Sequence, residues 1–250
     1  MSVSTEHLFS IPYLRTRIRH SKLEYEIEID VPVRGGHRPA VRCCLAGNYY
    51  EPFSHVNFKK ILDYRKNGSA IHAGTFFGDM LHTYSRSARM VYAFEPVLEN
   101  YVLAKQNAER LGLRNVVLVN AALSRENGIM SLSTHDAEGG FLGGASGFHN
   151  ENIGRCELVP TFRIDDFKTE DICLIQLDVE GHELSALEGA ANTITRHSPV
   201  ILIEDNLKNC GPFLNNLDYA HCFTRGGLSY WARQADYDFV STLRGDPQTG

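Results

Sequence analysis

A chain of 250 residues with 43% hydrophobic and 22% charged side chains is long enough to bury a sizeable core and has the composition of a globular protein. Its 25 Lys and Arg against 30 Asp and Glu give a net charge of -5, which argues against a basic surface for nucleic acid. The apolar runs are strand-sized and the N-terminus lacks a signal-peptide core, so we expect a cytoplasmic protein without a membrane segment. The six cysteines lack CxxC spacing, which argues against a zinc site.

The first 68 residues predict an extension before a main domain of residues 69–250. Residues 1–20 show no clear period, and we expect no more than a short helix there. Over residues 23–31 apolar and acidic side chains alternate, which is the period of a half-buried strand. The acidic residues of this strand are Glu24, Glu26, Glu28 and Asp30. We expect them to form a solvated outer face rather than a cation site.

A β-hairpin and a helix are expected to complete this extension. Turn-forming residues at 34–39 favour a return of the chain, with residues 40–45 as the second strand. Apolar residues at helical spacing predict a helix over residues 53–66, which Asn67 and Gly68 end. Formation of a homodimer through the hairpin is a hypothesis.

Strands and helices alternate along the main domain. Strands are predicted at residues 70–73, 90–94, 116–119, 172–177 and 199–203, and helices at 79–86, 97–111 and 183–196. This alternation predicts an α/β fold with a parallel sheet between helices, because right-handed crossovers carry each helix over the sheet. The C-terminal part predicts a helix at 212–217 and an antiparallel edge pair of strands at 219–223 and 239–243.

A glycine-rich segment from Gly139 to Gly154 interrupts the alternation, between short strands predicted at 129–133 and 157–162. A long loop inside a compact domain is usually functional or disordered. We therefore favour a mobile substrate loop over a passive insertion. His149, within this segment, could reach the substrate if the loop closed.

The stretch from Ile71 to Pro96 predicts half of a nucleotide-binding sheet. Gly74 and Gly78 bracket a turn after the first strand, and Glu95 ends the next strand 17 residues beyond Gly78. A carboxylate in that place can accept hydrogen bonds from both hydroxyls of a ribose. The same pattern also fits an ordinary βαβ unit whose glycines serve only turns.

Several motifs taken together are more specific. They are Gly-x-x-x-Gly-Asp at 74–79, Tyr-Ala-Phe-Glu-Pro at 92–96, Asn-Ala-Ala-Leu at 120–123, Arg-Ile-Asp-Asp-Phe at 163–167, Leu-Asp-Val-Glu-Gly-His-Glu at 177–183 and Pro-Val-Ile-Leu-Ile-Glu at 199–204. This set resembles the FkbM-type family of S-adenosylmethionine-dependent methyltransferases. The resemblance covers about residues 69–206, and we see no match outside them.

The resemblance implies the class I methyltransferase fold, a Rossmann-like sheet of order 3-2-1-4-5-7-6 with one antiparallel strand. It also implies S-adenosylmethionine as cofactor and methylation of a hydroxyl of a sugar or another specialised metabolite. The cofactor-binding residues it implies are His72, Gly74, Thr75, Gly78, Asp79, Glu95, Pro96, Asn120, Ala121 and Asp178. Two positions depart from the family pattern: His72 stands where an acid is usual, and Phe76 where a small residue is usual.

A hydroxyl is a poor nucleophile and needs a base or a metal ion. Asp178 is our first candidate for the base and His182 the second. The carboxylates near them could bind a divalent cation, although we assign no metal ligands. The alternatives are an N-methyltransferase, a nicotinamide-dependent oxidoreductase and a non-catalytic binding protein on a methyltransferase fold.

Overall fold

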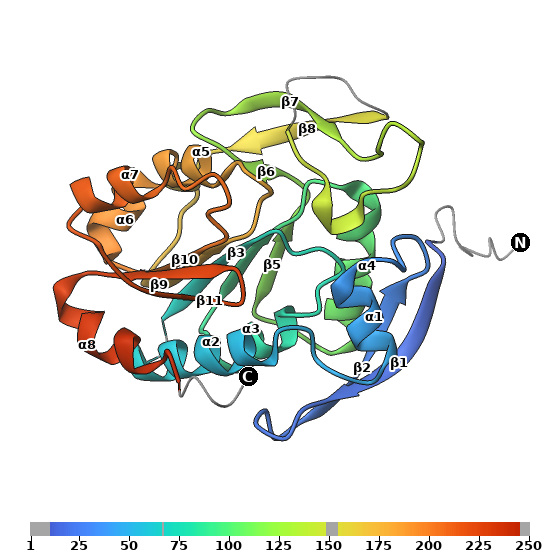
Figure 1. Cartoon of the computed structure of the whole chain (residues 1–250), viewed down its shortest axis with the longest axis horizontal. Helices are drawn as coiled ribbons and strands as arrows, with labels where there is room; N and C mark the ends of the chain where they lie inside the picture. The colour runs from blue at the N-terminus through green and yellow to red at the C-terminus, as the bar shows by residue number, and fades with distance from the viewer. Residues whose placement is uncertain (1–10, 67, 149–154, 246–250) are drawn as a thin grey trace, which may run out of the picture.

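The structure is a computed structural model that describes residues 11–66, 68–148 and 155–245. A seven-stranded sheet with helices on both faces forms its centre, and an N-terminal hairpin and a small three-stranded sheet lie beside it (Figure 1). His149 lies outside the described residues. In the part of the chain that is described, no helix is long and apolar enough to cross a bilayer.

The central sheet has the order β11-β12-β10-β9-β3-β4-β5. Its strands are β3 (Ser69–Ala73), β4 (Val91–Phe94), β5 (Val116–Val119), β9 (Ile172–Leu177), β10 (Val200–Ile203), β11 (Ala220–Arg225) and β12 (Leu228–Ala232). β12 runs antiparallel to both of its neighbours, and the other pairs are parallel. Numbered by their order along the chain, the strands read 3-2-1-4-5-7-6 with one antiparallel strand, as predicted.

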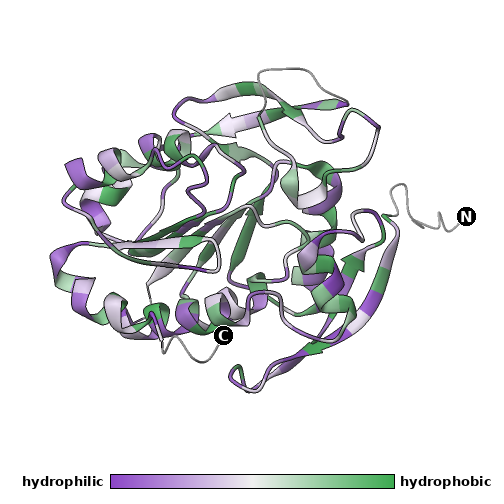
Figure 2. Ribbon diagram, viewed as in Figure 1, coloured by the Kyte–Doolittle hydropathy of each residue, from purple (hydrophilic) through white to green (hydrophobic). Residues whose placement is uncertain are grey.

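The middle strands are buried on both faces. Every residue of β3, β9 and β10 is buried, and their sequences are near-continuous apolar runs (Figure 2). Such runs are typical of parallel strands that helices cover on both sides. The few polar groups in these strands, His72 and Gln176 among them, therefore lie in an apolar interior.

In the described part of the chain, four helices cover one face of the sheet and three cover the other. The first face carries α2 (Pro52–Tyr64), α3 (Leu81–Ser87), α4 (Leu98–Arg110) and α8 (Gln234–Thr242), whose apolar residues form one core cluster with β3 and β9. The second face carries α5 (Glu183–Glu188), α6 (Ala191–His197) and α7 (Gly211–Asn216), which form another. The sheet thus separates two apolar cores.

The single helix predicted at 183–196 is wrong, because the chain breaks it into α5 and α6. A Cβ on Gly189 would lie 2.0 Å from the carbonyl oxygen of Ser124, so only glycine fits there. The carboxylate of Asp165 then accepts hydrogen bonds from the backbone N–H groups of Asn192 and Thr193, at 3.1 and 2.8 Å. This side chain from a distant segment caps the first turn of α6.

The edge strand predicted at 239–243 is also wrong, because these residues lie at the end of α8 and just beyond it. Val240 and Leu243 are three residues apart and pack into the same core, which fits a helical turn. The partner of β11 is β12 instead, and Gly226 and Gly227 form the two-residue turn between them with φ of 60° and 85°. Glycine suits such a hairpin turn because it requires positive φ.

Two further expectations for the extension are wrong. Residues 40–45 lie in helix α1 (Pro39–Leu45), which starts with a proline in its first turn and buries Ala40, Val41 and Cys44. The partner of β2 (Glu26–Pro32) is instead β1 (Tyr13–Arg19), in a stretch where we expected at most a helix. The helix predicted at 53–66 is confirmed as α2.

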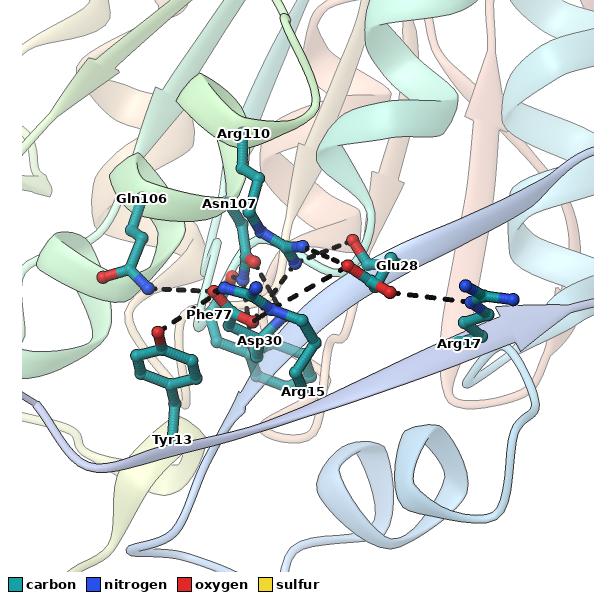
Figure 3. A network of polar contacts seen from close by, with 9 residues as sticks. All are labelled: Tyr13, Arg15, Arg17, Glu28, Asp30, Phe77, Gln106, Asn107 and Arg110. Carbon is teal, nitrogen blue, oxygen red and sulfur yellow. Dashed lines mark hydrogen bonds and ion pairs between the residues drawn. The ribbon is translucent and has the colours of Figure 1, made fainter.

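The acidic face of β2 is not wholly solvated. Glu26 is exposed, but Asp30 is fully buried and accepts hydrogen bonds from Arg15 and Gln106, both at 2.8 Å, beside Arg110 at 3.2 Å (Figure 3). Burial acts to raise the pKa of Asp30, but these donors outweigh it and the pKa is lowered. The carboxylate therefore ties the hairpin to α4.

Asn107 of α4 fixes the same strand by its backbone (Figure 3). Its side-chain oxygen accepts from the N–H of Asp30, and its amide group donates to the carbonyls of Asp30 and Phe77, each at 2.8 Å. Asn107 is fully buried, so all three bonds are shielded from water. One side chain thus joins the extension, α4 and the loop after β3.

The small sheet has the order β6-β8-β7 and consists of β6 (Ala122–Leu123), β7 (Gly128–Ser133) and β8 (Cys156–Phe162). It confirms the short strands predicted at 129–133 and 157–162. Two 3₁₀ turns, η1 (Gly143–Ala145) and η2 (Ile164–Asp166), complete the described secondary structure. Along the chain, the glycine-rich segment lies between β7 and β8.

Replacement of Asn107 by alanine tests the anchor between the extension and the main domain. The variant leaves the buried N–H of Asp30 and two carbonyls without partners, and we expect a loss of about 3 kcal/mol in the free energy of unfolding. Urea denaturation followed by circular dichroism measures it. Asn216→Ala, at an exposed position in α7, is the control and should change stability by less than about 0.5 kcal/mol. Equal effects of the two substitutions would contradict the proposed anchor.

Candidate active site

A cleft of about 350 Å³ opens where β3, β4, β9 and β10 end. Parallel strands present their carboxyl ends at one edge of a sheet, and ligands bind there at the point where strand order reverses. Here that point lies between β3 and β9. Gly74 lines the cleft by its backbone. The polar residues that line it are Arg38, Tyr50, Glu51, His72, Asp79, Glu95, Ser146, Gln176, Asp178, Glu180 and Glu204.

Gly74 is needed because the chain after β3 passes directly against the chain after β9. Its φ is 85°, and a Cβ there would lie 1.8 Å from the carbonyl oxygen of Asp178. The N–H of Asp178 donates to the carbonyl of Ala73 at 3.1 Å, which continues the parallel pairing to the edge of the cleft. Gly78 has the same φ and lies against Ala104 of α4. Both glycines therefore serve close backbone packing.

Glu95 lies directly after β4 with its carboxylate buried in the cleft wall. One oxygen accepts from the N–H of Phe76 at 2.8 Å, and the other accepts from the N–H of Val97 at 2.9 Å and the amide of Asn100 at 3.3 Å. Burial raises the pKa of Glu95 to about 7 despite these donors. A carboxylate oxygen can accept more than one hydrogen bond, so Glu95 retains capacity for a ligand's hydroxyls.

Phe76 brings the glycine-rich segment to this end of the cleft. Its φ is 49°, uncommon for a bulky residue, and its ring lies against Gly143 and Gly144. The amide of Asn100 also donates to the carbonyl of Gly143 at 3.4 Å. The described part of the segment thus forms a wall of the cleft, whereas its movement with substrate stays a prediction.

Asp178 and Glu204 form a pair of carboxyl groups at the ends of β9 and β10. They are hydrogen-bonded to each other, and burial together with Glu204 raises the pKa of Asp178 well above its usual range. Glu180, which has a φ of 52°, pairs with Arg38 at 3.7 Å. Two carboxyl groups in contact share a proton, and such a pair can take up a proton from a reacting group.

His72 is held between Gln176 and Tyr84. Its Nδ1 is hydrogen-bonded to the side-chain oxygen of Gln176, and its ring stacks on Tyr84 at 4.9 Å between centroids. Burial lowers its pKa to about 4, so the ring is neutral. Among the described residues its Nε2 has no hydrogen-bond partner.

The structure brings together only some of the predicted site residues. His72, Gly74, Asp79, Glu95, Pro96 and Asp178 line the cleft. Thr75, Gly78, Asn120, Ala121 and His182 do not line it in the described part of the chain. Asn120 instead donates to the carbonyls of Glu95 and Pro96, at 2.9 and 3.0 Å, and so fixes the loop that carries the carboxylate.

His182, the second candidate for the base, faces the residue that follows β6 of the small sheet. Its Nε2 lies 3.1 Å from the hydroxyl of Ser124, and its ring packs on Phe148 with 4.6 Å between centroids. Burial lowers its pKa. These contacts give no support to His182 as a general base that acts together with Asp178.

Sequence reasoning missed the cleft residues of the extension, Arg38, Tyr50 and Glu51. No local motif marks them, because they reach the cleft only through the packing of α1 and α2 on the main domain. One signal was present: Pro52 follows Glu51, which is typical of the first turn of a helix. This proline indicates that Glu51 precedes a helix, but it does not indicate that the start of the helix lies at the cleft.

The FkbM methyltransferase domain matches residues 71–218, more than half of the chain. The chain belongs to the FkbM methyltransferase family. The resemblance predicted from the motifs is thereby confirmed. Arg38, Tyr50 and Glu51 of this family member lie before the matched residues, so the cleft is built from the family domain together with the extension.

Solved methyltransferases are similar to this FkbM-family chain at low identity. The FkbM methyltransferase of Methylobacillus flagellatus KT has 18% identity and a TM-score of 0.48, over 66% of this chain and 43% of that one. This chain therefore spans less than half the length of that protein. An rRNA methylase of Streptococcus thermophilus has 15% identity and a TM-score of 0.42, over 72% and 93% of the two chains.

A further similar structure is a putative methyltransferase of Streptococcus mutans in complex with SAH. It has 16% identity and a TM-score of 0.42, over 72% of this chain and 94% of that one. Among curated proteins none matches this chain.

Metal binding gains no support from the arrangement of side chains. Within residues 11–66, 68–148 and 155–245, no three His, Cys, Asp or Glu side chains are grouped so that they could hold a metal ion. The carboxylates of the cleft are instead engaged with each other, with Arg38 or with hydroxyl and N–H donors.

The variant Asp79→Asn tests the buried carboxyl of the FkbM-family cleft. Burial raises the pKa of Asp79 from 3.8 to about 7, above its value in the unfolded chain. The folded state therefore prefers the protonated form, and this carboxyl lowers stability progressively as the pH rises from about 4 to about 7. Asparagine stays neutral, so the stability of the variant relative to the wild type should rise over this window, by an amount on the order of 4 kcal/mol. Denaturation at several pH values measures it, and a pH-independent difference would contradict the assignment.

Proposed function

We propose that the protein transfers the methyl group of S-adenosylmethionine to a hydroxyl of a small molecule, a sugar or a specialised metabolite. The observation that carries this proposal is the position of Glu95 and of the Asp178–Glu204 pair at two sides of one cleft, with Gly74 between them. Glu95 has the acceptor oxygens that the hydroxyls of a ribose need. The Asp178–Glu204 pair can take part in a proton transfer. Family membership supports the same reaction class.

The residues of the cleft fit this cofactor in shape and charge. Gly74 lines the cleft by its backbone alone, because the carbonyl of Asp178 fills the place of a side chain, so a ligand in the cleft can lie close to the chain there. Glu95 is a buried acceptor that would bind the two ribose hydroxyls. The methionine part would then extend past Gly74 toward the end of β9. S-adenosylmethionine carries a positive sulfonium and contains no phosphate, so a carboxylate-rich cleft favours it over a dinucleotide.

Methyl transfer depends mainly on the position of the acceptor. The hydroxyl oxygen must lie in line with the methyl–sulfur bond at about 3 to 3.5 Å from the methyl carbon. As the new carbon–oxygen bond forms, the methyl–sulfur bond breaks and its electrons stay on sulfur. The hydroxyl proton would pass to the Asp178–Glu204 pair, which is held at the required edge of the sheet and excluded from much of the solvent. The pair acts as general base in its singly protonated or ionised form.

An amine acceptor is the second candidate. Glu180 and Glu204 add negative charge beside Asp178 and favour a cationic group at that end of the cleft. N-methylation of a protonated amine would also need a base to remove a proton first. The methylated atom can be identified by NMR of the product.

The acceptor's chemistry sets further expectations. A cleft of this size suits a small molecule, and we keep the expectation that the protein does not act on nucleic acid. The division at residue 68 between extension and main domain stays a proposal, as does a homodimer through the N-terminal hairpin. Light scattering at high protein concentration tests the dimer, which a monomer would exclude.

Glu95→Gln tests the cofactor site. The glutamine loses one acceptor oxygen and the negative charge, and we expect the affinity for S-adenosylhomocysteine to fall about tenfold or more. Isothermal titration calorimetry measures it, with thermal unfolding as the check on folding. The control is Glu99→Gln on the neighbouring helix, where Glu99 pairs with Arg34 at 3.4 Å. If the two variants bind equally well, Glu95 does not bind the cofactor, and if NAD stabilises the wild type instead, the protein is not a methyltransferase.

Asp178→Asn tests the base. With an acceptor found by screening hydroxylated metabolites, we expect kcat to fall about 10²- to 10⁴-fold, because proton removal loses its base, while S-adenosylhomocysteine still binds. Asp171→Asn is the matched control at the opposite, exposed end of the same strand. Methyl transfer at the wild-type rate in Asp178→Asn would exclude Asp178 as the base.

A further inference from the structure

The turn between β9 and α5 brings Asp178 and Glu180 to the cleft, and Glu183 follows it as the first residue of α5. Glu183 is 1% exposed and is not among the described residues that line the cleft. Neither the cofactor site nor the proton transfer proposed above uses it. We propose that Glu183 is a positioning residue, which fixes the backbone of this turn so that Asp178 stays in place as the base. This inference rests on the proposed function and adds a residue to it.

The carboxylate of Glu183 reaches back to the turn that precedes its helix. Its Oε1 accepts hydrogen bonds from the N–H of Val179 at 3.0 Å and from the N–H of Gly181 at 3.1 Å. Burial raises the pKa of Glu183, although these N–H donors act to lower it. One buried oxygen thus joins two points of the turn, and water has little access to these bonds.

The backbone of the turn needs such support. Glu180, which lies between the two donors, has a φ of 52°, and Gly181 has a φ of 91°. A positive φ is unfavourable for a residue with a side chain, and it persists only where the surrounding contacts hold it. Here the two hydrogen bonds to Glu183 lie on either side of Glu180. They hold the conformation in which Glu180 pairs with Arg38 of the extension at 3.7 Å.

Asp178 is fixed by backbone hydrogen bonds on both sides. Its own N–H donates to the carbonyl of Ala73 at 3.1 Å, and the next N–H along the chain, that of Val179, donates to Glu183. A displacement of about 1 Å at a reacting group can reduce a rate about 10²-fold. A residue that holds the base can therefore matter for the rate although it does not touch the substrate.

The geometry distinguishes an acceptor from a charge. Both N–H groups donate to a single oxygen, so this role of Glu183 needs an acceptor oxygen but no negative charge. Glu183→Gln keeps such an oxygen at the same distance from the backbone. Glu183→Met has a similar length but lacks an oxygen. If the negative charge only stabilised the start of α5, both substitutions would remove its effect.

NMR titration of the Asp178 carboxyl group tests the inference without cofactor or acceptor. The titratable groups that act on Asp178 or lie near it are Glu51, Glu180, Glu204 and Tyr50. Burial and the contact with Glu204 raise the pKa of Asp178. A loosened turn lets Asp178 move away from Glu204 and toward solvent, so we expect its pKa to be lower in Glu183→Met than in the wild type. In Glu183→Gln it should be unchanged.

Methyl transfer gives a second readout. We expect kcat to fall about 10- to 100-fold in Glu183→Met and to stay within about threefold of the wild type in Glu183→Gln. Because the base then has a lower pKa, the acid limb of the pH profile of kcat should also move to lower pH in Glu183→Met. The matched control is Glu188→Met, which removes a partly exposed carboxylate of the same helix that pairs with Arg125 at 3.3 Å. It should leave kcat and the pKa of Asp178 as in the wild type.

Three results overturn the inference or the proposed function separately. If Glu183→Gln lowers kcat as much as Glu183→Met, the charge matters and positioning is not the role of Glu183. If Glu183→Met lowers the melting temperature but changes neither kcat nor the pKa of Asp178, Glu183 supports only its helix. A wild type that neither binds S-adenosylhomocysteine nor transfers a methyl group overturns the proposed function, whereas the titration still decides whether Glu183 holds Asp178. If Glu183→Met does not fold, Glu183→Asp takes its place with the same expectations, because its carboxylate is one methylene shorter and falls short of the two N–H groups.

Discussion

The contact between the chain after β3 and the chain after β9 determines the rest of the site. Only a glycine fits at position 74, because any side chain would collide with the carbonyl of Asp178. This close approach brings Asp178 to the same edge as Glu95 and leaves an open backbone surface between them. The two functions that we assign to these carboxylates, ribose binding and proton transfer, both depend on that spacing.

The buried carboxyl groups of the cleft are costly to ionise, and a cationic ligand would offset this cost. Burial raises the pKa values of Glu95 and Asp79 to about 7, and it raises those of Asp178 and Glu51 as well. In each case folding works against the charged form. A ligand with positive charge stabilises the ionised carboxylates, so its binding energy includes the relief of this penalty. A cleft of this kind is less stable alone but selects cations over anions.

The sequence predicted the central sheet well because its strands are short apolar runs between clear turns, and the motif residues follow them. β9 and β5 lie where they were expected. Errors arose where tertiary contacts decide the local structure. Gly189 breaks a helix because Ser124 lies against it, and residues 40–45 form a helix because β1 takes the place of the expected second strand. Glu51 could not be assigned to the cleft, because its helix packs on a face that only the fold defines.

The extension and the family domain are coupled through buried hydrogen bonds. Asp30 of the hairpin is bonded to Asn107, Asn107 to the carbonyl of Phe77, and the N–H of the adjacent Phe76 to Glu95. The position of Glu95, to which we assign ribose binding, thus depends on the same helix that holds the hairpin. Since Glu51 and Arg38 also reach the cleft from the extension, its loss would disturb both ends of the site at once. The cleft is therefore lined by the matched family domain together with residues that precede it.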